Sequence, residues 1–316
     1  MKKTIIILLA LTLLLGVAAC TPKSTETTPA NVAVLAGPTG VGAAYLMAEQ
    51  ADRYNVSLFT APDQIVAQIV NGELDIAAVP VNLAATLYNK TEGNIVVLAV
   101  NTLGVLYFVT NNAEINSISD LAGKTVYSTG KGSTPQYVLE YLLDKEGLTD
   151  AVQVEYLSDN SDLIAKLADG SVEVALLPEP HVSIATAQSD TLRVAFSAND
   201  VWAKWNDTEL VQGVYIARKD YAEAHPEVIS AFLTDAKASA DRVLTEEDAA
   251  AVVVAQGIIG KEAIAKKAIP NCNICLKTGV EMQQMVAAML TVLFDANPQS
   301  VGGALPADDF YYASAS

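Results

Sequence analysis

The chain of 316 residues has few of the side chains that carry out catalysis in hydrolytic and metal-dependent enzymes. Its two histidines are His181 and His225, and its acidic residues form no HExxH motif or comparable cluster of ligands. Ser183 lies beside His181, but no GxSxG motif surrounds it. The sequence therefore predicts a protein that is not an enzyme and that needs no metal ion or cofactor. An enzyme built on the same fold stays as an alternative.

Positive charge is also scarce. The chain has 19 Lys and Arg residues against 36 Asp and Glu residues, a net charge of −17. This balance disfavours nucleic acid as a partner, because binding to the phosphate backbone depends on clustered Lys and Arg. It does not exclude a small anionic ligand, since salt screens distant charges beyond roughly 8–10 Å.

Long apolar runs are absent after residue 20, so no second membrane-spanning segment is predicted. The first run follows Lys2 and Lys3 and is short, which is typical of a signal peptide over residues 1–19. It ends in Ala18-Ala19-Cys20, which resembles the lipobox of bacterial lipoproteins and implies that Cys20 is lipidated. Residues 20–30 are polar and predict a flexible tether. We expect a protein anchored at the extracytoplasmic face of the cell membrane; an ordinary signal peptide with a chance cysteine is the alternative.

A Gly-rich stretch, GPTGVGAA at residues 37–44, lacks the Lys and the hydroxyl residue of a nucleotide-binding phosphate loop. Those two side chains serve the phosphates and Mg²⁺ of a nucleotide, so the stretch does not predict nucleotide hydrolysis. It predicts instead a turn in which the backbone comes close to a ligand.

An internal repeat organises the rest of the chain. Residues 61–80 match residues 159–178 in type, and each copy gives a helical pattern, a Gly stop and a short strand that ends in Pro. A strand, a Gly-rich turn and a helix precede each copy. Alternating strands and helices predict an α/β fold with parallel-rich sheets. We expect two lobes, residues 31–108 with 210–316 and residues 109–209, joined by two crossings that form a hinge; one large sheet is the alternative.

These features together resemble the type II periplasmic substrate-binding proteins of ABC importers, in the group that binds nitrate, sulfonates, taurine and thiamine precursors. The resemblance rests on the lipobox, NGELDIAAVP and its twin DGSVEVALLPEP, ISDLAGKTVYSTGKGSTPQYVLEYLL, and the terminal VGGALPADDFYY. It implies a monomer that captures a small molecule between its lobes and delivers it to an ABC permease and its ATPase. A tripartite-transporter receptor and a membrane sensor share the fold and stay as alternatives.

The predicted ligand site follows from the turns at the strand ends, where helix N-termini place N–H groups at the crevice. The candidate residues are Gly37, Pro38, Thr39, Gly40, Thr60, Asp63, Pro80, Asn82, Ser128, Thr129, Lys131, Ser133, Thr134, Glu179 and His181. The hydroxyl residues are also interpretable as helix caps alone, and Lys131 as a solvated side chain.

Glu179 and His181 have no counterpart in the first repeat. A carboxylate facing the ligand favours a cationic, amine or ring N–H group over a bare anion. Glu179 therefore shifts the expected ligand from inorganic anions towards an organic or heterocyclic solute. A helix cap and a contact that closes the lobes are the alternatives for Glu179. Trp202 and Trp205 are candidates for stacking on a planar ligand, or for packing at the hinge.

Three cysteines are present, and two of them form the single CxxC, Cys272-Asn-Ile-Cys275. Too few other ligands lie nearby for a zinc site. A disulfide, a redox pair and two free thiols stay open from the sequence.

Overall fold

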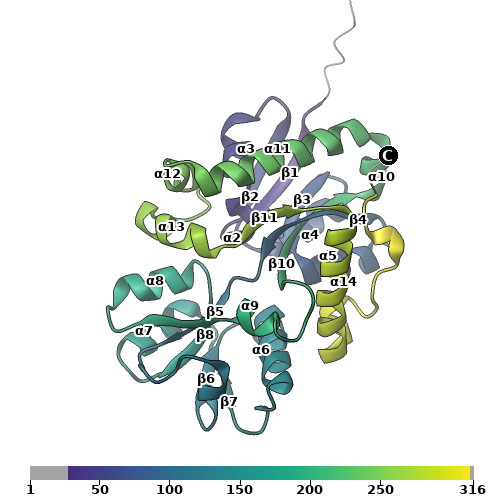
Figure 1. Cartoon of the computed structure of the whole chain (residues 1–316). Helices are drawn as coiled ribbons and strands as arrows, with labels where there is room; N and C mark the ends of the chain where they lie inside the picture. The colour runs from purple at the N-terminus through teal and green to yellow at the C-terminus, as the bar shows by residue number, and fades with distance from the viewer. Residues whose placement is uncertain (1–27, 314–316) are drawn as a thin grey trace, which may run out of the picture.

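The computed structural model of the chain describes residues 28–313. The predicted signal peptide, Cys20 and most of the predicted tether lie outside the described residues. Within them the chain forms two sheets, each flanked by helices, and Figure 1 shows one lobe above the other. The two-lobed α/β fold predicted from the repeat is confirmed.

The sheet of lobe 1 has six strands in the order β11-β4-β10-β3-β1-β2. Strands β2, β1 and β3 are parallel, whereas β10 is antiparallel to both β3 and β4. The strands are β1 (Ala30–Leu35), β2 (Tyr54–Phe59), β3 (Ile76–Pro80), β4 (Ile95–Leu103), β10 (Val211–Arg218) and β11 (Ile274–Lys277). Val32 and Val34 of β1 are buried on one face of the sheet, and Ala33 and Leu35 on the other. Because both faces are covered, this strand is apolar except at Asn31.

The sheet of lobe 2 has five strands in the order β7-β6-β8-β5-β9. Its parallel part, β7-β6-β8, repeats the arrangement of β2-β1-β3, and β5 and β9 continue it in antiparallel pairing. The strands are β5 (Leu106–Thr110), β6 (Thr125–Ser128), β7 (Gln153–Tyr156), β8 (Val174–Pro178) and β9 (Arg193–Ser197). Each sheet is therefore mixed, with its parallel strands on one side.

The chain passes between the lobes twice. β4 ends at Leu103 and β5 begins at Leu106 in the other sheet, so the first crossing is at Gly104 and Val105. This is earlier than the predicted boundary after residue 108. The reason is physical: β4 and β5 are both buried along their whole length, and only Gly104 and Val105 separate them. The second crossing runs from α9 (Ala198–Trp202) to β10.

Helices cover both faces of each sheet. Those of lobe 1 are α2 (Pro38–Val41), α3 (Ala44–Glu49), α4 (Pro62–Val70), α5 (Val81–Lys90), α10 (Lys219–Ala224), α11 (Pro226–Thr245), α12 (Ala249–Ala255), α13 (Glu262–Ala268) and α14 (Gly279–Ala296), with short 3-10 turns η2 (Ile269–Asn271), η3 (Pro298–Val301) and η4 (Asp308–Phe310). Those of lobe 2 are η1 (Ile118–Leu121), α6 (Thr134–Lys145), α7 (Asn160–Ala168), α8 (His181–Gln188) and α9. No helix of residues 28–313 is long and apolar enough to cross a membrane.

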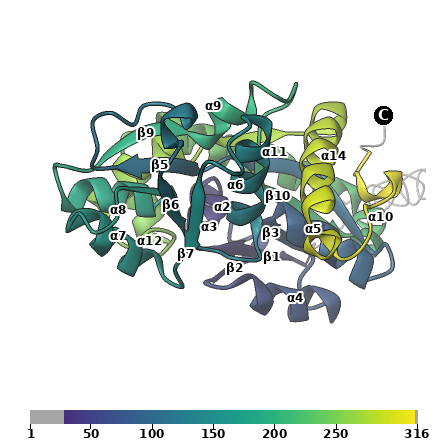
Figure 2. The same cartoon turned by 90° about the horizontal axis from the view of Figure 1, so that it is seen from below.

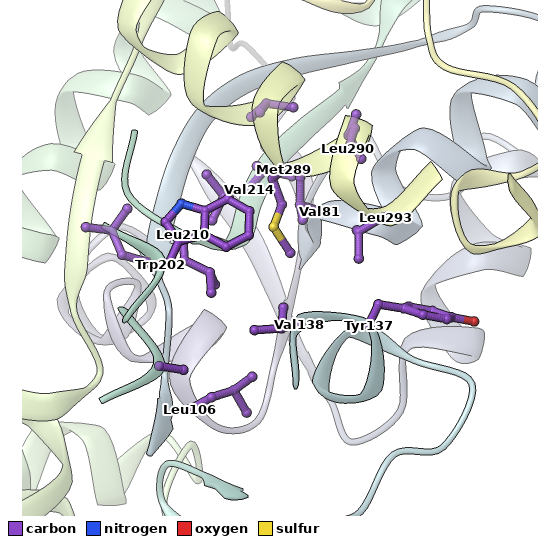
Figure 3. Packing of buried hydrophobic residues seen from close by; sticks show 14 of the residues in the cluster. Val81, Leu106, Tyr137, Val138, Trp202, Leu210, Val214, Met289, Leu290 and Leu293 are labelled. Atoms are coloured by element: carbon purple, nitrogen blue, oxygen red, sulfur yellow. The ribbon is translucent and has the colours of Figure 1, made fainter. Parts of the chain in front are cut away.

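One apolar core runs through both lobes. It contains the predicted stripe of α14, including Met282, Met289 and Leu293, together with residues of α5, α6 and both crossings. Figure 3 shows Val138 of α6 beneath Met289 of α14, with Trp202 beside them. Trp202 is fully buried, so it belongs to this core and is not exposed for stacking on a ligand. Trp205 is 49% exposed and donates a hydrogen bond to Glu146.

Candidate ligand site between the lobes

The helices α5 and α6 follow the parallel strands β3 and β6, and a contact between their first turns crosses the boundary between the lobes. Figure 2 shows the molecule from below, with α6 and β6 of lobe 2 in front of α2 and β3 of lobe 1. Several side-chain hydrogen bonds cross this boundary, and two of them involve predicted site residues. Thr134 Oγ1 of α6 lies 3.5 Å from Asn82 Oδ1 of α5, and Asn271 Nδ2 donates to Glu179 Oε1 at 3.1 Å. The structure therefore brings together predicted site residues that are far apart in the chain.

The turn after β1 has a backbone that requires glycine at two positions. Gly37 has a φ of 93°, which favours glycine. A Cβ at Gly40 would lie 2.1 Å from the carbonyl oxygen of Leu35, so only glycine fits there. Pro38 occupies the first position of α2, where its fixed φ suits a helix start. Thr39 is buried, and its carbonyl oxygen accepts a hydrogen bond of 3.1 Å from Asn101 Nδ2.

Asn101 and Thr102 were not among the residues predicted from the sequence. They lie at the end of β4. Gly213 of β10 pairs with both Pro80 of β3 and Thr102 of β4, so the ends of β3 and β4 lie on either side of β10. Asn101 Oδ1 and Thr102 Oγ1 are buried and have no hydrogen-bond partner among residues 28–313. Unpaired buried polar groups cost roughly 1–3 kcal/mol each, so these atoms mark a place where a polar ligand group would be stabilised. The signal in the sequence is the polar pair that ends the apolar run IVVLAV.

The starts of α5 and α6 face one another through Asn82 and Thr134. Neither helix has an acidic residue in its first turn, and neither has a side-chain hydrogen bond at its N-cap, Pro80 or Ser133. Most of the other helices have an acidic residue in the first turn. These residues are Asp63 in α4, Asp162 in α7, Asp200 in α9, Asp220 in α10, Glu227 in α11, Glu262 in α13 and Glu281 in α14. Free N–H groups and the positive end of the helix dipole therefore remain uncompensated at the two starts that meet between the lobes.

The loop between β6 and α6 holds the predicted hydroxyl residues in different roles. Ser128 Oγ is buried and donates to the carbonyl oxygens of Thr129 and Leu176. Thr129 Oγ1 donates to Asn160 Oδ1 at 2.8 Å, which ties this loop to the start of α7. Ser133 donates to the carbonyl oxygen of Gly130 and does not cap α6. Lys131 is exposed at the tip of the loop.

Glu179 is 1% exposed, yet its carboxylate is well satisfied. It accepts hydrogen bonds from the backbone N–H and the hydroxyl of Ser183 in α8, and from Asn271 of lobe 1. Burial raises the pKa of the Glu179 carboxyl, and the three hydrogen bonds oppose that shift. These contacts match the two alternatives kept for Glu179, a helix cap and a contact that closes the lobes.

His181 is half-buried, and its Nδ1 has no hydrogen-bond partner among residues 28–313. Burial lowers the pKa of the His181 imidazole, and Asp159 opposes this shift. The ring is therefore favoured in its neutral form at neutral pH. Tyr156 at the end of β7 likewise has a buried hydroxyl without a partner in the described chain.

Thr60 lies before α4 and Asp63 in its first turn, and both are exposed. In residues 28–313 no side-chain hydrogen bond or ion pair joins either residue to lobe 2. The structure thus does not bring them into contact with the other predicted site residues.

Cys272 and Cys275 are free thiols in the described structure. Burial raises the pKa of both thiols, that of Cys275 to about 12. A raised pKa disfavours the reactive thiolate. No cluster of three or more potential metal ligands occurs among residues 28–313.

Two lobes, two chain crossings and a polar site at the strand ends define the class of two-lobed solute-binding proteins. A family model described as "ABC transporter, phosphonate, periplasmic substrate-binding protein" matches residues 42–267. The chain belongs to this family, whose members are extracytoplasmic, substrate-binding components of ABC transporters and are not enzymes. The predicted class, a substrate-binding protein of an ABC importer, is confirmed.

Solved structures show the same fold. An ABC transporter protein from Parabacteroides distasonis is 24% identical, with a TM-score of 0.80 over 92% of this chain and 100% of that chain. The periplasmic aliphatic sulphonate binding protein SsuA from Escherichia coli is 20% identical, with a TM-score of 0.70 over 88% of this chain and 91% of that chain. The alkanesulfonate-binding protein SsuA from Xanthomonas axonopodis pv. citri, bound to MOPS, is 16% identical, with a TM-score of 0.62 over 90% and 96% of the two chains. No curated protein sequence matches the chain significantly.

Proposed function

We propose that the protein captures an organic oxyanion, a phosphonate or a sulfonate, between its lobes and delivers it to an ABC permease. The observation that carries this proposal is the meeting of the α5 and α6 starts at Asn82 and Thr134, without an acid in either first turn. Backbone N–H groups at helix starts bind the oxygens of such anions. Because one helix comes from each lobe, an anion bound to both starts stabilises the closed arrangement.

The surroundings of Glu179 support an anion over a cation. Its carboxylate already accepts three hydrogen bonds, from Ser183 and Asn271, so it is not free to bind a ligand amine. This weakens the main argument that the sequence offered for a zwitterionic or heterocyclic solute. The net charge of −17 does not oppose the proposal, because charges beyond roughly 8–10 Å are screened.

An organic group on the anion is supported by the family and by the similar structures. The matching family is described as phosphonate-binding, and the two SsuA proteins are described as binding aliphatic sulphonate and alkanesulfonate. Hydroxyl and amide groups near the helix starts, including Thr129, Thr39 and Asn101, are suited to the remaining polar groups of such a solute.

Thermal unfolding with a ligand panel tests the proposal. The panel contains 2-aminoethylphosphonate, methylphosphonate, taurine, an alkanesulfonate, nitrate, inorganic phosphate and a thiamine-precursor pyrimidine. A ligand at about a thousandfold its Kd stabilises the protein by roughly 4 kcal/mol, which raises the Tm by several degrees. We expect the largest shift from a phosphonate or sulfonate. A shift from the pyrimidine alone, or from no member of the panel, would contradict the proposal.

The attachment to the membrane is a separate part of the proposal. We infer that Cys20 carries the lipid, that residues 20–30 tether the lobes, and that the protein works as a monomer. Replacing Cys20 with Ser should release the protein from the membrane fraction, whereas the native chain stays with it. Gel filtration of the released protein should give the mass of one chain. Release of the native chain without detergent would contradict the anchor.

A further inference from the structure

On one side of the boundary, a hydrogen bond to a carboxylate joins the two lobes. Asn271 of η2, in lobe 1, donates from Nδ2 to Glu179 Oε1 of lobe 2 at 3.1 Å. Glu179 is 1% exposed, and its other oxygen accepts from the backbone N–H of Ser183 at 3.2 Å. The carboxylate is therefore held in place by its own helix, α8, and offers a fixed acceptor to Asn271.

Asn271 is also linked to the first crossing between the lobes. Its carbonyl oxygen accepts a hydrogen bond of 2.8 Å from the hydroxyl of Tyr107 in β5. Asn273 Nδ2 donates to the same hydroxyl at 3.2 Å and to the carbonyl oxygen of Gly104 at 2.6 Å. Movement of η2 relative to α8 is thus coupled to the backbone at which the chain changes lobes.

The buried apolar clusters on this side do not extend across the boundary in the described chain. The buried cluster near α12 and α13 contains residues of lobe 1 alone, and the cluster under α7 and α8 contains residues of lobe 2 alone. A groove of about 400 Å³ separates them, lined from lobe 2 by Pro180 and Ile184 and from lobe 1 by Ile259 and Ile264. Figure 1 shows α8 and α13 facing one another at this place. No shared buried core of residues 28–313 holds the lobes together on this side, so the polar contacts of Asn271 contribute more to closure here than polar contacts do on the other side.

We propose that Asn271 is a positioning residue that latches the lobes closed through its hydrogen bond to Glu179. The latch acts on the arrangement of the lobes and does not depend on which solute is bound. A hydrogen bond to a charged group that is lost without replacement shifts an equilibrium roughly tenfold or more. Loss of the amide of Asn271 should lower the ratio of closed to open protein by that factor.

The charged and polar groups around Glu179 favour its hydrogen bond with Asn271. The groups that face Glu179 are Lys267 from the end of α13, the thiol of Cys272 and the hydroxyl of Tyr107. Lys267 attracts the carboxylate, and burial raises the pKa of the thiol and the hydroxyl, so both are neutral at neutral pH. An acid in place of Asn271 would bring a second carboxylate against Glu179 and replace attraction by repulsion.

Small-angle scattering of the protein without ligand tests the latch. The variants are Asn271→Ala, which removes the donor, and Asn271→Asp, which adds repulsion. The matched control is Tyr137→Phe, which removes the hydrogen bond of 2.9 Å from Asn297 Nδ2 to the Tyr137 hydroxyl on the opposite side of the lobe boundary. We expect the radius of gyration to increase for Asn271→Ala, to increase further for Asn271→Asp, and to stay at the native value for Tyr137→Phe.

A pH series separates the latch from a purely local role of Asn271, which also donates to the carbonyl oxygen of Lys267. Lowering the pH protonates one of the two facing carboxyls in Asn271→Asp, so that variant should become compact again while Asn271→Ala should not. The proposal is wrong if both variants have the native radius of gyration, or if Asn271→Asp stays expanded at low pH while its melting curve shows a folded protein.

Discussion

The two sides of the boundary between the lobes are built from different interactions. On the side of α6 and α14, buried residues such as Val138, Met289 and Trp202 belong to one core that runs through both lobes. On the side of α8 and α13, the cores of the lobes stay separate, and the hydrogen bond between Asn271 and Glu179 joins them across a groove. Apolar contacts of the first kind add stability in proportion to buried area, whereas a single polar contact is easily exchanged for water. The difference indicates which side holds the lobes together and which side is free to separate.

The largest expected change in stability comes from removing a side chain of the apolar core that both lobes share. Trp202 is fully buried beside both crossings, and its indole N–H donates to the carbonyl oxygen of Thr208. Trp202→Ala should lower the free energy of unfolding by about 3–5 kcal/mol, because it removes a large core side chain. Urea denaturation measures this change. Trp205→Ala is the control, since Trp205 is 49% exposed, and should cost at most about 1 kcal/mol. Equal costs for the two variants would contradict the account of the shared core.

Gly40 and Gly260 have different surroundings, a tight turn and an open groove. A Cβ at Gly40 would lie 2.1 Å from the Leu35 carbonyl oxygen, whereas a Cβ at Gly260, in the groove between α8 and α13, meets nothing within 4 Å. Gly40→Ala should lower the free energy of unfolding by about 1–3 kcal/mol through overpacking. Gly260→Ala should raise it by about 0.4–1 kcal/mol, because it restricts the unfolded chain. Thermal or urea unfolding of both variants checks the signs, and a destabilised Gly260→Ala would show that the groove is closely packed.

Glu179 gives the polar side a pH dependence. Burial raises the pKa of its carboxyl above the ordinary value of 4.5. A raised pKa in the folded state means that the folded chain binds the proton more readily than the unfolded chain. The resulting stability is fully present below pH 4.5 and is lost as the pH rises through the folded pKa. The free energy of unfolding of the native protein minus that of Glu179→Gln should therefore fall with rising pH in this window. Urea denaturation at a series of pH values measures it, and a difference that grows with pH would overturn the account.

The repeat made the fold largely predictable from the sequence. Both copies contain a helical pattern, a Gly stop and a short apolar strand, and these became α4 with β3 and α7 with β8. The first crossing lies earlier than predicted, because β4 and β5 are both buried throughout and only Gly104 and Val105 lie between them.

The site was predictable where it lies on strand ends, and not where it depends on contacts between distant segments. The positions of Asn82 and Thr134 at the boundary are predictable, because each follows a strand of the repeat. The contact of Asn271 is not predictable, because no local pattern relates it to Glu179, 92 positions away. Asn101 and Thr102 were missed because they end a strand that is otherwise apolar.

A substitution of Asn82 tests the proposed function most directly, and its expected effect on stability is the smallest among these substitutions. Asn82→Asp puts an acid in the first turn of α5 and should stabilise the ligand-free protein by about 0.3–1 kcal/mol through the helix dipole. The matched control is Asn94→Asp, before the opposite end of β4, where the substitution keeps the oxygen that accepts from the Asp220 N–H.

Titration calorimetry of Asn82→Asp, with the phosphonate or sulfonate that most raises the Tm of the native protein, is the decisive measurement. The account predicts binding at least about tenfold weaker than in the native protein, because a carboxylate then faces the bound anion, and native affinity in Asn94→Asp. Unchanged or tighter binding by Asn82→Asp would contradict the claim that the helix starts of the two lobes hold an anion between them.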